Sequence, residues 1–95
     1  MTYRHIVVSY DVVDNPRRAR LAKYLKGHLE RVQKSVFEGE IADRMLEKLK
    51  QGIAKHIDQE ADTVRIYTLC ERCIPSVEII GTGVFIERPE EDVLV

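Results

Sequence analysis

Long apolar runs are missing from this 95-residue sequence, and so is a recognisable leader segment. No window approaches the roughly 20 consecutive apolar residues that a membrane-spanning helix requires. Residues 1–5 run directly into a β-branched segment, without the separate charged and apolar regions of a signal peptide. We therefore expect a cytoplasmic protein that makes no contact with membranes. Its length predicts one domain over residues 1–95.

Cysteine is scarce, and the two that are present, Cys70 and Cys73, form a single C-x-x-C pair. A structural zinc site needs four protein ligands, and no second pair or nearby histidine follows to supply the others. A thioredoxin-type redox pair would open a helix after the first strand, whereas this pair follows the third hydrophobic region. The pattern favours structural thiols. Redox chemistry and a zinc site shared across a dimer are the alternatives.

A large net charge is also missing, because 15 basic side chains nearly balance 16 acidic ones. Their distribution is uneven. Residues 1–37 hold eight basic and three acidic side chains, and the rest of the chain holds seven basic and thirteen acidic. A basic front on an acidic body is typical of a soluble protein with one surface for polyanions. The alternative is that these charges lie on solvated helix faces, are distributed at random and form no binding surface.

The first half of the chain predicts a strand, a helix and a hairpin. Residues 4–11 are rich in β-branched side chains and predict a strand. Asp14 or Asn15 is suited to cap the following helix, with Pro16 in its first turn and Gly27 at its end. Residues 30–41 have strand character that is interrupted near the middle, which predicts two short strands or one bent hairpin.

The second half predicts a clear amphipathic helix followed by strands. Apolar residues recur there at steps of three and four, at Ala42, Met45, Leu46, Leu49, Ile53 and Ile57. Residues 62–70 predict another strand, and residues 77–80 with 84–86 predict a last one. The resulting order, β-α-β-β-α-β with an additional C-terminal strand, is the α+β ferredoxin-like pattern. We expect a second copy of the chain to cover the free sheet face, and the tail 84–95 to pair with a partner subunit.

Asp11 ends the first strand, and three arginines occupy the helical turn that follows. A carboxylate is costly to bury without a partner, so the side chain of Asp11 is expected at the edge or end of the sheet. There it can cap backbone N–H groups, pair with a basic side chain or bind a cation. Arginines lie at the unfavourable end of the helix dipole, a local cost that favours an anion-binding explanation. We therefore take Asp11 and the arginine turn as the candidate site. The alternative is that the arginines only neutralise Asp11 and Asp14.

Four blocks of the chain together resemble a known family. They are the strand ending in Tyr10 and Asp11, the arginine-rich helix start, RVQKSVFEG at residues 31–39, and DTVRIYTLC at residues 62–70. In spacing and order they resemble the small CRISPR-associated adaptation proteins, the non-integrase partners in spacer acquisition. The VQ-x-SVFEG segment is the most specific of the four.

The resemblance implies a ferredoxin-like homodimer that bridges integrase dimers and holds the DNA to be inserted. It also implies that the first-strand aspartate binds a divalent cation, usually Mg²⁺, shared between two subunits, and that some members are metal-dependent endonucleases on RNA or double-stranded DNA. By position, Asp11 becomes the metal and catalytic candidate. The nucleic-acid-binding candidates carried over in the same way are Tyr10, Arg17, Arg18, Arg20, Arg31 and Phe37.

The residues by themselves leave two points open. A single carboxylate per chain is a poor magnesium site, because the ion prefers six oxygen ligands. Phe37 is a more usual core residue than a base-stacking one. The two main hypotheses are thus a magnesium-dependent phosphodiesterase and a DNA-binding scaffold for the integrase. A small ferredoxin-like ribonuclease toxin or a regulatory module is the alternative.

Overall fold

The computed structural model describes residues 2–70 and 77–81 of the chain. Within them, the predicted order of strands and helices is confirmed. The elements are β1 (Tyr3–Asp11), α1 (Asn15–Lys26), β2 (Glu30–Gln33), β3 (Val36–Ala42), α2 (Asp43–Lys55) and β4 (Thr63–Leu69). Neither helix is long and apolar enough to cross a membrane.

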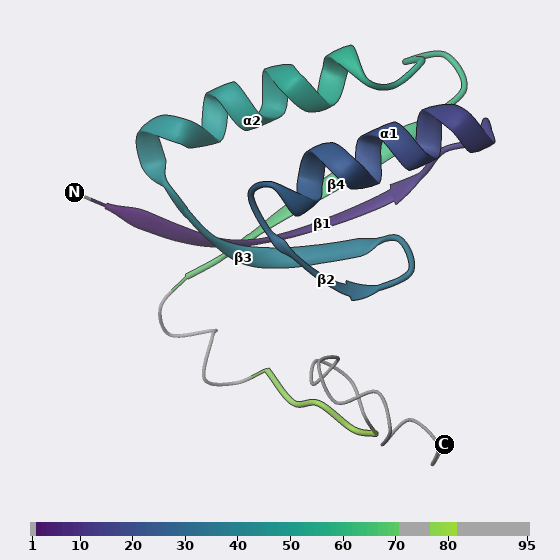
Figure 1. Ribbon diagram of the computed structural model, residues 1–95. Coiled ribbons are helices and arrows are strands. Elements are labelled where there is room, and N and C mark those ends of the chain that lie inside the picture. The colour runs from purple at the N-terminus through teal and green to yellow at the C-terminus, as the bar shows by residue number, and fades with distance from the viewer. Residues whose placement is uncertain (1, 71–76, 82–95) are drawn as a thin grey trace.

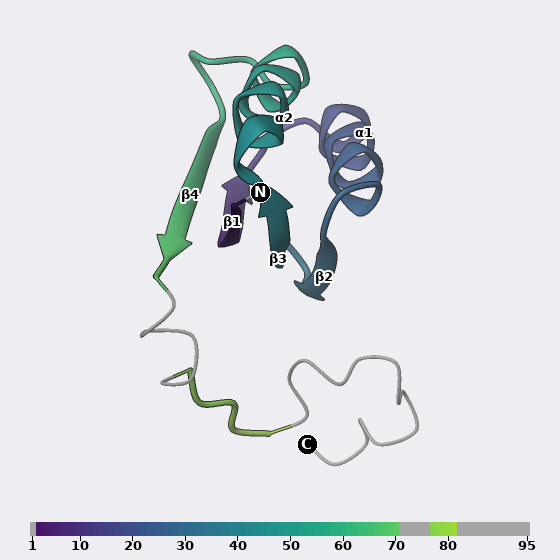
Figure 2. The same cartoon turned by 90° about the vertical axis from the view of Figure 1, so that its left-hand side faces the viewer.

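The four strands form one antiparallel sheet in the order β2-β3-β1-β4, and both helices cover the same face of it. Figure 2 shows the two layers end-on, with α1 on the side of β2 and α2 nearer to β4. This confirms the α+β ferredoxin-like fold. The additional strand expected at 84–95 lies outside the described residues, and the segment 77–80 is described without strand structure.

The first helix begins and ends where its sequence predicts. Asp14 is the N-cap of α1, since its carboxylate accepts a hydrogen bond of 2.9 Å from the backbone N–H of Arg17, and Pro16 follows in the first turn. The chain leaves this helix at Gly27. In α2 the predicted apolar stripe faces the sheet, with Leu49 and Ile53 buried at its centre.

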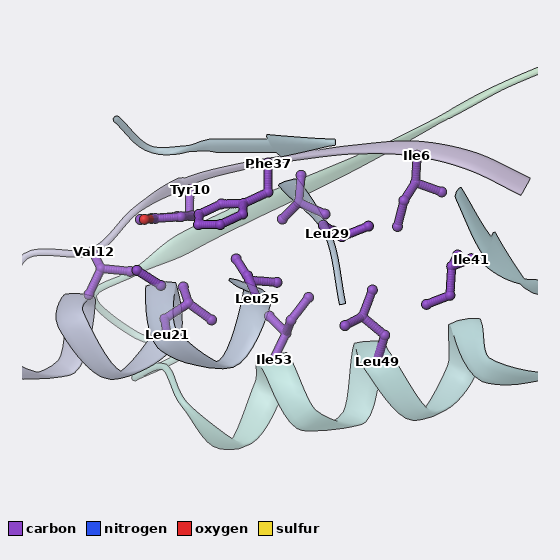
Figure 3. Close-up of a cluster of buried hydrophobic side chains, with 12 residues drawn as sticks. Ile6, Tyr10, Val12, Leu21, Leu25, Leu29, Phe37, Ile41, Leu49 and Ile53 are labelled. Carbon is purple, nitrogen blue, oxygen red and sulfur yellow. The ribbon is translucent and has the colours of Figure 1, made fainter. Parts of the chain in front are cut away.

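The core lies between the sheet and the helices. Ile6, Val8 and Tyr10 of β1 are buried, because alternate residues of a strand face the same side. Phe37 of β3 is fully buried, and its ring stacks on that of Tyr10 with 6.2 Å between centroids. Figure 3 shows these two rings beside Leu21 and Leu25 of α1 and Ile53 of α2. The preference for Phe37 as a core residue is thereby confirmed.

Neither of the two described helices covers the opposite face of the sheet. His5, Val7, Ser9 and Asp11 of β1 alternate with the buried residues and therefore lie on this open face. Two large aromatic residues, Tyr3 and Tyr67, are 59% and 49% exposed. The pleat places Tyr67 on the open face as well, since it pairs with Val7 across β1 and β4.

Replacing the ring at the centre of the core tests this packing. Because the side chain of Phe37 is fully buried, Phe37→Ala removes apolar contacts and leaves a cavity. We expect a loss of about 3–5 kcal/mol in the free energy of unfolding, measured by urea titration. The control is Val13→Ala, at a residue that is 65% exposed, which should change stability by no more than about 0.5 kcal/mol. Equal effects of the two substitutions would contradict the placement of Phe37.

Candidate functional site

The loop between β1 and α1 is held in place by an ion pair with the start of β4. Arg17 donates to both carboxylate oxygens of Asp62, with Nε–Oδ2 at 2.7 Å and Nη2–Oδ1 at 3.2 Å. The side chain of Asp62 has no exposed surface. Its oxygens also accept hydrogen bonds from the backbone N–H groups of Val13 and Asp58. One carboxylate thus ties the end of β1 and the first turn of α1 to the loop that precedes β4.

These contacts shift the pKa of Asp62. The hydrogen bond from Arg17 is the largest influence and holds the pKa of this carboxyl well below its usual range. Burial acts in the opposite direction, and the N–H groups of Asp58 and Val13 reinforce the lowering. This pair could not be predicted from the sequence, because an aspartate before a strand also suits an ordinary turn.

The three arginines of the first turn of α1 have different surroundings in the structure. Arg17 forms a hydrogen-bonded ion pair with Asp62. Arg18 donates to the carbonyl oxygen of Val12 at 2.6 Å and to the side chain of Asn15. Arg20 is exposed, and within the described residues it has no ion pair. Two of the three unusual first-turn arginines therefore have structural partners, neither of which is Asp11.

Asp11 lies at the end of β1, opposite Thr63 of β4 in the sheet register. It is exposed, and its side chain makes no hydrogen bond or ion pair with any residue that the structure describes. No group of three His, Cys, Asp or Glu side chains gathers into a metal-binding cluster within the same residues. One copy of the described chain thus does not fit a magnesium ion, which needs more oxygen ligands than Asp11 offers.

A cationic groove of about 660 Å³ runs between α1 and the turn that joins β2 to β3. Five basic side chains line it: Arg18, Lys23, Lys26, Arg31 and Lys34. The other lining residues are small or polar, and none of the described residues around the groove is acidic. Five cations without a neutralising carboxylate repel one another, so the groove favours the binding of a polyanion. We call this feature the cationic groove.

The β2–β3 turn is fixed by hydrogen bonds to one backbone oxygen. The carbonyl of Lys34 accepts from Nε and Nη2 of Arg31, at 3.1 and 2.7 Å. It also accepts a longer bond of 3.4 Å from the hydroxyl of Tyr10. The guanidinium of Arg31 lies 5.5 Å from the centre of the Phe37 ring, within the range of a cation–π contact. These contacts hold Arg31 and Lys34 at the wall of the groove.

The structure places the rings of Tyr10 and Phe37 in the core rather than on the surface of the groove. Tyr10 is 5% exposed and Phe37 is fully buried, so neither ring can stack on a base. Both act on the groove indirectly, Tyr10 through the Lys34 carbonyl and Phe37 through the guanidinium of Arg31.

Of the predicted site residues, the structure brings only Arg18 and Arg31 together in the cationic groove. The groove is also lined by three lysines that are not among the predicted site residues: Lys23, Lys26 and Lys34. All three belong to the basic part of the sequence, residues 1–37. The spacing of Lys23 and Lys26 would have indicated that they share a helix face. Their proximity to residues 31–35 depends on the tertiary structure, which no local pattern reveals.

Comparison with known proteins identifies the family. Residues 4–77 match the family model described as CRISPR associated protein Cas2. The chain belongs to the Cas2 family. The match covers the described strands and helices except for Tyr3 at the start of β1, and it includes Asp11 and every residue that lines the cationic groove.

Relatives and solved structures agree with this assignment. A protein of Chloroflexus aurantiacus named CRISPR-associated endoribonuclease Cas2 1 is 41% identical over 81% of this chain and 84% of its own length. One of Thermus thermophilus, CRISPR-associated endonuclease Cas2 2, is 39% identical over 99% and 100%. A chain of a solved structure titled Partial Cas6-RT-Cas1–Cas2 complex superposes with a TM-score of 0.70 and 28% identity, covering 81% of this chain and 84% of that one.

The Arg17–Asp62 pair predicts how stability depends on pH. The carboxyl of Asp62 has a lowered pKa in the folded protein and an ordinary one, about 3.9, in the unfolded chain. Its contribution to stability is therefore complete above about pH 4 and is lost as the pH falls through the folded value. We expect wild type to be more stable than Asp62→Asn at pH 7, and this difference to shrink between about pH 4 and pH 2 in urea titrations.

The exposed residue Glu60 provides the control. Glu60→Gln should follow the wild-type curve closely over the same pH range. Parallel curves for wild type and Asp62→Asn, with a constant difference down to pH 2, would show that the carboxylate of Asp62 is not selectively stabilised by Arg17.

Proposed function

We propose that the protein is a nucleic-acid-binding scaffold in CRISPR spacer acquisition, and that the cationic groove holds the phosphate backbone of double-stranded DNA. The observation that carries this function is the set of five basic side chains around a groove whose described lining includes no acid. Arginine and lysine neutralise phosphates, and a contact of this kind needs no particular base sequence. A scaffold that handles DNA of varied sequence requires binding of this kind.

Two protein partners complete the proposal. The first is a second copy of the chain, seated on the open sheet face, where Tyr3 and Tyr67 would lose their exposure to water. The second is the CRISPR integrase, a proposal supported by the similarity to a chain of the solved complex that contains Cas1 and Cas2. The tail 84–95, expected to pair with a partner subunit, lies outside the described residues.

Neutralising the lysines of the groove tests DNA binding. Lys23 and Lys26 are exposed, and neither makes an ion pair among the described residues. We expect K23Q/K26Q to weaken duplex binding and to flatten the plot of log affinity against log salt concentration by about 1.8, since each phosphate contact contributes about 0.9. Fluorescence anisotropy of a labelled duplex, measured at several salt concentrations, gives both quantities.

The matched control also removes two positive charges, but from α2 instead of α1. Arg44 and Lys50 are exposed helix residues outside the groove. R44Q/K50Q should leave the salt dependence close to that of wild type. If the two double variants lose affinity equally, only the net charge matters and the groove is not the binding site.

Nuclease activity at Asp11 is a second candidate function. It is favoured by the exposure of this carboxylate, by its lack of a partner among the described residues, and by the endonuclease names of the relatives. Because one chain does not fit a magnesium ion, we propose that two Asp11 side chains share it across the dimer. A bound divalent cation would activate water for phosphodiester cleavage. Asp11 would serve to hold the ion and position it against the phosphate.

Removing this carboxylate tests the second function. Asp11→Ala should abolish magnesium-dependent cleavage of RNA and duplex DNA while leaving the thermal midpoint nearly unchanged, because the side chain is exposed. Cleavage is measured with magnesium titrated across several pH values. Glu40→Ala, which removes another exposed acid, should retain activity. Cleavage that persists in rigorously purified Asp11→Ala would eliminate this function and leave the scaffold proposal standing.

A further inference from the structure

A second groove lies on the other side of α1, between this helix and α2. Its volume is about 490 Å³. The lining residues are Tyr24, His28, Met45, Lys48, Leu49, Gln51, Gly52, Lys55 and His56. As in the cationic groove, none of the described lining residues is acidic. Figure 2 shows α1 and α2 side by side on one face of the sheet.

Three aromatic rings meet in this groove. The ring of Tyr24 stacks on that of His56, with 4.8 Å between centroids and 22° between planes. His28 meets Tyr24 edge-on at 5.0 Å. Tyr24 also reaches the backbone of α2, because a side chain at Gly52 would collide with its hydroxyl. Glycine weakens a helix interior by roughly 1 kcal/mol relative to alanine, and here it makes room for this close approach.

Two lysines suit the groove to a phosphate-bearing ligand, whereas the neutral ring of His56 offers that ligand only a hydrogen-bond acceptor, Nε2. Nδ1 of His56 lies 2.7 Å from the carbonyl oxygen of Gly52, and since a carbonyl only accepts, this nitrogen carries the hydrogen. Nε2 of His56 is left without a hydrogen-bond partner among the described residues. Lys48 and Lys55 of α2 are exposed at the same groove and make no ion pair within those residues.

We propose that this second groove binds one nucleotide unit of single-stranded nucleic acid. Lys48 and Lys55 hold its phosphates, and its base packs on the exposed ring of His28 at the edge of the three-ring cluster. Stacking on aromatic rings inside a positive groove is how proteins retain single strands without reading their sequence. The site is separate from the cationic groove, and α1 contributes residues to both.

Histidine ring signals in NMR report directly on this site. The chain has three histidines. His5 of β1 lies on the sheet face that points away from both helices, where its Nε2 is 3.0 Å from a carboxylate oxygen of Glu38. We expect an oligothymidylate of about six nucleotides to shift the ring protons of His28 and His56 and to leave those of His5 in place. Shifts confined to His5, or no binding of the oligonucleotide, would overturn the proposal.

Charge variants separate this site from the cationic groove. K48Q/K55Q should remove the shifts and flatten the salt dependence of oligothymidylate binding by about 1.4, at about 0.7 per phosphate on a single strand. R44Q/K50Q should preserve both, and K23Q/K26Q should preserve the His28 and His56 shifts even if duplex binding fails. Unchanged binding by K48Q/K55Q, with its thermal midpoint intact, would assign the second groove to helix packing or to a protein partner instead.

Discussion

The buried carboxylate of Asp62 is the constraint on which the arrangement of the site depends. A carboxylate without exposed surface needs partners for both oxygens, and it finds them in Arg17 and in two backbone N–H groups. These partners belong to the end of β1, the first turn of α1 and the loop before β4. The ion pair therefore fixes where α1 starts relative to the sheet. The remaining turns of α1 follow from that start, and they carry Lys23 and Lys26 to the cationic groove.

The other wall of the groove depends on the core. Phe37 is fully buried beneath Arg31, and Arg31 and Tyr10 both donate to the carbonyl of Lys34. The packing of the core and the shape of the groove thus depend on the same residues: the apolar ring supports the guanidinium, which fixes the turn that presents Lys34. The open sheet face is a separate surface, and Asp11 belongs to it. This separation is why DNA binding and nuclease activity can be tested independently.

The strands and helices were predictable because their apolar periodicity and caps are local signals, as the stripe of α2 and the Asp14 cap show. All five basic residues that line the cationic groove fall within the basic part of the sequence, residues 1–37. The Arg17–Asp62 pair was not predictable, since its members are 45 residues apart and each looks ordinary in its own segment. The resemblance placed Tyr10 and Phe37 near the site but could not distinguish contact with a ligand from support beneath it. Only the burial of both rings decides that question.

Backbone amide shifts on addition of a short DNA duplex test most directly whether the cationic groove is the DNA-binding surface. In ¹H–¹⁵N NMR spectra of the full chain, the largest shifts should fall on the outer face of α1 and on residues 31–35, and they should weaken as salt is raised. The strands of the open sheet face should change little. Shifts concentrated on β4 and the open face, with α1 unaffected, would contradict the assignment of DNA to the groove.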